Sequence, residues 1–208
     1  MTTIEVFADI TCPFTHVGLK RVVARLASLG GDSKIIVRAW PLEWVNGVPL
    51  DADAVAMKAG VMTDQMGVTD FNGFDRAQWP ESTIPALNLA AAAYEKDHNT
   101  GLAASLKLRA LVFEQGMKVD DPKTLGGLAQ ELGIADWAYS TEPSPQVQAD
   151  YDDGTKRKVR GSPDFWVGPD EFFCPSLTIG HDDDGALTSE FDPEGLDRFI
   201  ERAVADRA

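Results

Sequence analysis

The chemistry of this 208-residue chain centres on one of its two cysteines. Cys12 is followed by Pro13 and Phe14, and proline suits the first position of a helix because its missing N–H would have no partner there. At a helix N-terminus, the free backbone N–H groups and the positive end of the helix dipole stabilise a negative sulfur. We therefore expect Cys12 to be an activated thiolate and the nucleophile of a reaction.

Two neighbours could assist this thiol. The hydroxyl of Thr15 can donate a hydrogen bond to the sulfur, and a protonated His16, one helical turn after Cys12, would favour the thiolate. A plainer interpretation stays open, in which Cys12 is a small buried residue at a helix end and His16 faces solvent or bonds a carbonyl.

The elements that must position Cys12 can be predicted from periodicity. Residues Thr3–Ala8 alternate as a strand, a helix should run from Pro13 to Gly30-Gly31, and Lys34–Trp40 forms a second strand. Helix formers dominate from Asp51 to about Arg160, and strand signals return afterwards. The expected helices are 55–66, 83–96, 102–115, 124–132, 144–158 and 193–205, and the expected late strands are 164–167 and 171–174.

Three motifs together resemble the DsbA family of the thioredoxin superfamily. They are DITCPFTHVGLKR at 9–21, RAWPLEW at 38–44 and VRGSPDFWV at 159–167. The chain is most similar to the cytoplasmic FrnE-like branch and, more distantly, to the 2-hydroxychromene-2-carboxylate isomerases and kappa-class glutathione transferases. The resemblance implies an α/β thioredoxin-like fold (βαβ…ββα) with a large helical insertion. Residues 1–48 and 159–208 would form the thioredoxin-like domain, and 49–158 the helical subdomain.

The resemblance also implies which residues form the site. Pro163 would be the family's cis-proline, and the backbone of Ser162 would face Cys12 and pair with a substrate. Pro13, Phe14 and Arg160 complete the expected substrate-binding set. Arg160 belongs to a basic cluster that can equally be a solvated helix end.

The chain departs from the family pattern at the second thiol. Family oxidoreductases carry Cys-x-x-Cys, whereas Cys12-Pro13-Phe14-Thr15 has threonine at its last position. A single-thiol enzyme cannot resolve its own mixed disulfide within this motif, so we expect an external small thiol to finish each cycle. Glutathione or an equivalent low-molecular-weight thiol would serve as cosubstrate, with no tightly bound cofactor.

Three functions are compatible with these residues. The leading one is a DsbA-like thiol–disulfide oxidoreductase acting through Cys12 on a disulfide or an electrophilic small molecule. A thiol-dependent isomerase or S-transferase is the alternative, although the chain departs from those relatives, which usually place serine at the position of Cys12. The third is a catalytically inactive, peptide-binding homologue.

Cys174, which follows two phenylalanines, is interpreted as a buried packing residue.

Charge and composition limit the partners. Nineteen Lys and Arg against 33 Asp and Glu leave a net charge of −14, which repels phosphate backbones and anionic lipids. We therefore expect no nucleic-acid or membrane partner, and a homodimer stays open. Neither His98 nor His181 has a second ligand at a metal-binding interval, so no metal is expected. No secretory signal is visible in the first ten residues, and the expected location is the cytoplasm.

Overall fold

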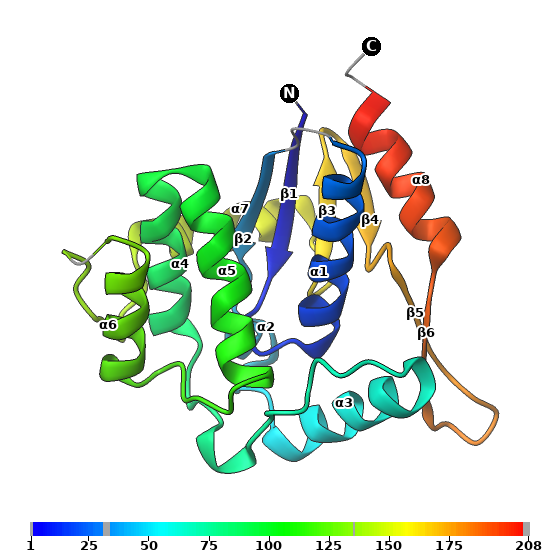
Figure 1. Cartoon of the computed structure of the whole chain (residues 1–208), viewed down its shortest axis with the longest axis horizontal. Helices are drawn as coiled ribbons and strands as arrows, with labels where there is room; N and C mark the ends of the chain where they lie inside the picture. Colours follow the sequence, from blue (N-terminus) through cyan, green and yellow to red (C-terminus); the bar gives the residue numbers. More distant parts are fainter. Residues whose placement is uncertain (1, 31–33, 135, 206–208) are drawn as a thin grey trace.

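A four-stranded mixed sheet is the framework of the computed structural model, which describes residues 2–30, 34–134 and 136–205 (Figure 1). Its strand order is β2-β1-β3-β4. The β1 strand is parallel to β2 and antiparallel to β3, which is in turn antiparallel to β4. The strands are β1 (Thr3–Ala8), β2 (Lys34–Ala39), β3 (Asp164–Val167) and β4 (Asp170–Phe173).

Two helices cover one face of this sheet, α1 (Pro13–Ser28) and α8 (Pro193–Val204) (Figure 1). Alternate residues of β1, Ile4 and Val6, point into a core shared with Leu19 and Phe199, because side chains alternate between the faces of a strand. Each helix begins with proline in its first turn, after Cys12 and Asp192 respectively. The predicted βαβ unit and the final ββα order are thus present.

The opposite face is covered by α7 (Pro145–Arg157), which approaches the sheet closely at Gly154. A Cβ atom there would lie 2.6 Å from Trp40 and 3.0 Å from Phe7. Only a residue without a side chain therefore lets this helix lie so near the sheet.

The remaining helices lie between β2 and β3 in the chain and build a second hydrophobic core. This core joins residues such as Met62, Leu89, Leu108 and Phe113. The predicted helices are present with shifted ends. For example, α5 starts at His98 instead of residue 102 because the Asp97 side chain caps it by accepting from Thr100 N. The bounds are α2 (Leu42–Asn46), α3 (Ala52–Met66), η1 (Arg76–Gln78), α4 (Ile84–Lys96), α5 (His98–Phe113) and α6 (Pro122–Glu131).

Sequence reasoning missed α2, η1 and a separate hairpin of β5 (Leu177–His181) and β6 (Leu187–Phe191). The acidic run after His181 forms its turn, where the Asp182 carboxylate accepts from the N–H groups of Asp184 and Ala186. The hairpin packs on α3, and Ser189 N donates to Gln65 at 2.7 Å. The two strands are short and carry many polar residues, so their pattern is weak.

Side chains cap the outer edge of β2. The Tyr94 hydroxyl accepts from Val37 N at 2.8 Å and donates to Ile35 O at 3.3 Å. A carboxylate oxygen of Asp150 accepts from Ala39 N at 3.0 Å.

Within the described residues, no helix combines the length and apolarity that crossing a bilayer requires.

Candidate active site

Asp9 fixes the turn that carries Cys12 from the end of β1 to the start of α1. Its buried carboxylate accepts from Thr11 N at 2.7 Å and from the Thr11 hydroxyl at 2.6 Å. It also accepts from Leu42 N at 2.9 Å and from the Thr83 hydroxyl at 3.0 Å. One side chain therefore ties this turn to α2 and to the residue that precedes α4.

Cys12 occupies the N-cap position of α1, with extended backbone angles (φ −80°, ψ 115°), and is 4% exposed. Its Sγ donates to the backbone oxygen of Ser162 at 2.9 Å, across 150 residues of sequence. The peptide bond from Ser162 to Pro163 is cis. The structure thus brings the expected nucleophile and the expected loop into direct contact.

The hydroxyl of Ser162 makes two further contacts with the segment around Cys12. It accepts from Asp9 N at 2.9 Å and lies 2.7 Å from the Thr15 hydroxyl. Thr15 is fully buried, so its side chain is directed at the Ser162-Pro163 loop and not at solvent. The position at which family oxidoreductases carry a second thiol is therefore part of a hydroxyl pair.

His16 is a buried ring in contact with a backbone carbonyl, as in the plainer interpretation. Burial, followed by the charge of Lys20, lowers the pKa of His16 to about 4, so the ring is neutral at pH 7 and supplies no positive charge to the thiolate. Its Nε2 lies 3.1 Å from a carboxylate oxygen of Glu114 and 3.2 Å from the backbone oxygen of Asp70. His16 thus links α1 to two segments of the helical insertion.

The carboxylates beside His16 are held by an ammonium group. His16, Asp70 and Glu114 place ligand-type atoms within 4.8 Å of one another, which is a geometry that could hold a metal ion. Lys20 contacts both carboxylates, at 2.8 Å for Glu114 and at short distance for Asp70. The lysine therefore already offsets one of the two carboxylate charges of this cluster.

Arg109 is a residue of the site region that sequence reasoning missed. It is 1% exposed, and its guanidinium donates to Asp9 O at 3.0 Å and to Ser105 O at 2.7 Å. Burial lowers its pKa to about 10, and the charges of Asp9 and Cys12 act in the opposite direction. The available signal was its spacing, because Arg109 follows Gly101 and Ser105 at intervals of four on the buried face of α5.

The other expected residues lie around this centre with different partners. Pro13 is buried, and the half-buried Phe14 packs against the larger core. Arg160 pairs with Glu171 and lies over the ring of Phe173 at 4.9 Å. Arg160 lies three residues beyond the end of α7 and is exposed, and its role in substrate binding stays a prediction.

Cys174 is buried, as expected, and donates its backbone N–H to Pro163 O at 3.2 Å. Burial raises the pKa of its thiol well above the usual value. Cys12 and Cys174 are almost equally buried, at 4% and 5% exposure. Their positions therefore separate them, because Cys12 alone stands at a helix N-terminus.

A thiol at the first turn after β1, facing a serine-proline loop that precedes β3, defines the class as a thioredoxin-like thiol enzyme. The family model of the DSBA-like thioredoxin domain matches residues 3–183. The chain therefore belongs to the DSBA-like thioredoxin domain family, whose members are thiol–disulfide oxidoreductases.

Solved structures show the same fold at low identity. The cytosolic disulfide reductase DsbM from Pseudomonas aeruginosa has 16% identity and a TM-score of 0.61, with 98% of each chain covered. The same protein with GSH has 15% identity and a TM-score of 0.63, covering 98% of this chain and 99% of that one. A 2-hydroxychromene-2-carboxylate isomerase has 12% identity and a TM-score of 0.57, covering 82% and 88%. A search of curated proteins finds no match.

Proposed function

We propose that the protein is a thiol–disulfide oxidoreductase that uses Cys12 as its single nucleophilic thiol and an external small thiol to complete the cycle. The observation that carries this proposal is the contact of Cys12 Sγ with Ser162 O at 2.9 Å, beside a threonine hydroxyl instead of a second thiol. The family supplies the reaction type, and the single thiol defines the mechanism.

The first step is attack of the Cys12 thiolate on a substrate disulfide. One S–S bond breaks, a Cys12–substrate disulfide forms, and the other half leaves as a thiolate. Loss of the proton ends the Sγ–H donation to Ser162 O and leaves a sulfur that can accept from the free N–H groups of the first turn of α1. An external thiol then attacks the mixed disulfide, its sulfur bonds to the substrate sulfur, and Cys12 is released reduced.

The small thiol is proposed to be glutathione or an equivalent. Support comes from the absence of a second thiol in the Cys12 motif and from the DsbM structure with GSH, which covers the chain end to end. We also propose a cytoplasmic setting, where such thiols are abundant and where the name of DsbM places that protein.

Trapping of the mixed disulfide tests the proposal directly. We expect the reduced protein, mixed with oxidised glutathione, to gain one glutathione by intact mass and to lose it on addition of reduced glutathione. The Cys174→Ser variant should behave like the wild type, and Cys12→Ser should form no adduct. An adduct that persists in Cys12→Ser, or no adduct in the wild type, would refute the role of Cys12.

A second variant tests whether the site can support a dithiol cycle. Thr15 is fully buried and its hydroxyl lies at the loop that Cys12 also contacts, so Thr15→Cys places a second sulfur beside the first. We expect Thr15→Cys to reduce insulin disulfides with dithiothreitol faster than the wild type. Equal or lower activity would show that this position cannot resolve a mixed disulfide.

The isomerase or S-transferase function has one specific observation in its favour. The paired hydroxyls of Thr15 and Ser162 lie 2.7 Å apart beside Cys12, and such groups can orient the sulfur of a bound cosubstrate. Under this alternative, Cys12→Ser keeps conjugation of glutathione to 1-chloro-2,4-dinitrobenzene, whereas the oxidoreductase loses all thiol exchange. If the protein is instead an inactive, peptide-binding homologue, its Cys12→Ala variant should suppress the aggregation of other proteins as well as the wild type does.

A further inference from the structure

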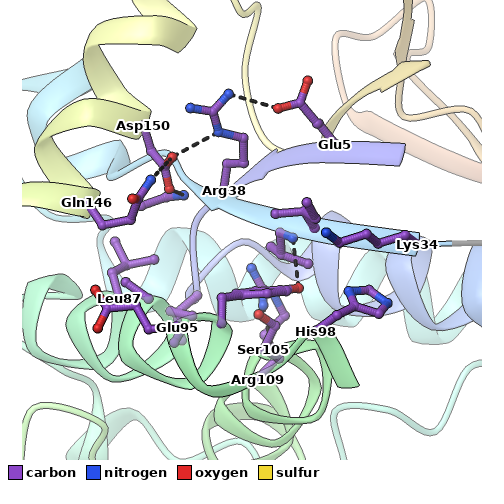
Figure 2. Close-up of a pocket in the computed structure, with 17 residues that line it drawn as sticks. Glu5, Lys34, Arg38, Leu87, Glu95, His98, Ser105, Arg109, Gln146 and Asp150 are labelled. Atoms are coloured by element: carbon purple, nitrogen blue, oxygen red, sulfur yellow. Dashed lines mark hydrogen bonds and ion pairs between the residues drawn. The ribbon is translucent and has the colours of Figure 1, made fainter. Parts of the chain in front are cut away.

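A cavity of about 370 Å³ lies between β2 and the helices α4 and α5, with α7 at one end (Figure 2). On α4, Leu87, Ala90 and Ala91 form an apolar part of its wall, followed along the same helix by Tyr94 and Glu95. Neither Cys12 nor Ser162 is among the residues that line it. The cavity is therefore distinct from the surroundings of the Cys12 thiol, although Arg109, which contacts Asp9, also lines it.

Three charged groups of the cavity, Glu5, Arg38 and Asp150, are already paired with one another. Arg38 binds Glu5 and Asp150, each at 2.9 Å, and Gln146 donates to the same oxygen of Asp150 at 2.9 Å (Figure 2). The Tyr94 hydroxyl is committed to the backbone of β2. These groups form a closed network that leaves little capacity for a ligand.

Arg109 differs from them because nothing directly neutralises its charge. Its two hydrogen bonds go to carbonyl oxygens, and its Nε has no partner among the described residues although it is buried. The Asp9 carboxylate acts on it only at a distance, since its own contacts are with Thr11, Leu42 and Thr83. A buried cation without a direct counter-ion is unfavourable, and an anion in the cavity would stabilise it.

We propose that this cavity binds a small monocarboxylate with an apolar body, and that Arg109 is the receptor for the carboxylate. A planar carboxylate matches the guanidinium fork of Arg109. The apolar body lies along Leu87, Ala90 and Ala91. The volume is at the lower end of the range for ligand pockets, which favours a compact ligand.

Calorimetric titration of the wild type with matched acids and amides tests the proposal. The probes are hexanoate and benzoate, compared with hexanamide and benzamide. We expect one saturable site per chain and an affinity about tenfold or more higher for each acid, because hydrogen bonds between charged partners are about twice as strong as neutral ones. This comparison needs no variant. Absence of saturable binding, or equal binding of acid and amide, would overturn the proposal.

Variants locate the site. Ala90→Leu fills the cavity from α4 while Arg109 remains, and we expect it to weaken hexanoate binding about tenfold or more. Ala103→Leu, on α5 outside the cavity, is the matched control and should bind normally. Cys12→Ser should also bind normally, so the outcome is independent of the proposed thiol chemistry. Unchanged binding in a folded Ala90→Leu would place the ligand elsewhere and refute the assignment.

Discussion

The hydroxyl pair of Thr15 and Ser162 allows a quantitative test of the site geometry by a double-mutant cycle. Thr15→Val keeps the shape of the side chain but leaves the Ser162 hydroxyl without its partner at 2.7 Å. Ser162→Ala leaves two buried groups unpaired, the Thr15 hydroxyl and the N–H of Asp9, which donates to Ser162 Oγ at 2.9 Å. The two variants should therefore differ in cost.

Each unpaired buried polar group costs about 1–3 kcal/mol, and a neutral hydrogen bond contributes about 0.5–1.5 kcal/mol. We expect Thr15→Val to lower the free energy of unfolding by about 1–2 kcal/mol and Ser162→Ala by about 2–4 kcal/mol. In the double variant only the Asp9 N–H stays unpaired, so its cost should be about 2–3 kcal/mol. The coupling between the two sites is then about 1–3 kcal/mol.

Urea unfolding of the wild type, both single variants and the double variant measures the cycle. Thr155→Val is the control for the exchange itself, because that threonine is an exposed residue of α7. Costs that add to within about 0.3–0.5 kcal/mol would mean that the two hydroxyls are not paired, and the interpretation of Thr15 as part of the site would be wrong.

Three further predictions concern ionisable groups. Burial raises the pKa of Asp164 from 3.8 to about 6, so its contribution to stability is complete below about pH 4 and is lost as the pH rises through 6. The Asp164→Asn variant should flatten this pH dependence in urea midpoints measured from pH 4 to 7. Burial lowers the pKa of His16 from 6.5 to about 4, so its contribution to stability is present above about pH 6.5 and is lost on acidification. The His16→Gln variant should therefore lose less stability at low pH. An unchanged pH dependence of the urea midpoint would contradict the buried neutral ring. The raised pKa of Cys174 predicts no alkylation of this thiol in the folded protein, so Cys12→Ser should abolish labelling by iodoacetamide in intact mass and Cys174→Ser should leave it unchanged.

Elements with strong local patterns could be predicted from the sequence. The alternation of Thr3–Ala8 predicted both ends of this strand correctly, and the proline after Cys12 predicted the first residue of α1. The hairpin of β5 and β6 could not be predicted, because its strands owe their position to packing against α3 and not to a strong apolar alternation of their own.

The site was only partly accessible to sequence reasoning. The approach of Ser162 to Cys12 followed from a family resemblance, since the two residues are 150 positions apart and no local pattern joins them. The neutral state of His16 could not be predicted, because its burial results from packing between α1 and the insertion. Arg109 was missed although its spacing on α5 places it on the buried face.

The side-chain caps on β2 have a consequence for how this molecule can meet other chains. An uncovered edge strand offers N–H and C=O groups on which a foreign strand can assemble. Here Tyr94 and Asp150 occupy those groups at Val37, Ile35 and Ala39, so the sheet is closed to growth on that side. A second chain that pairs with β2, whether in a dimer or in an aggregate, would first have to displace Tyr94 and Asp150 from these hydrogen bonds. We therefore expect association to use another surface.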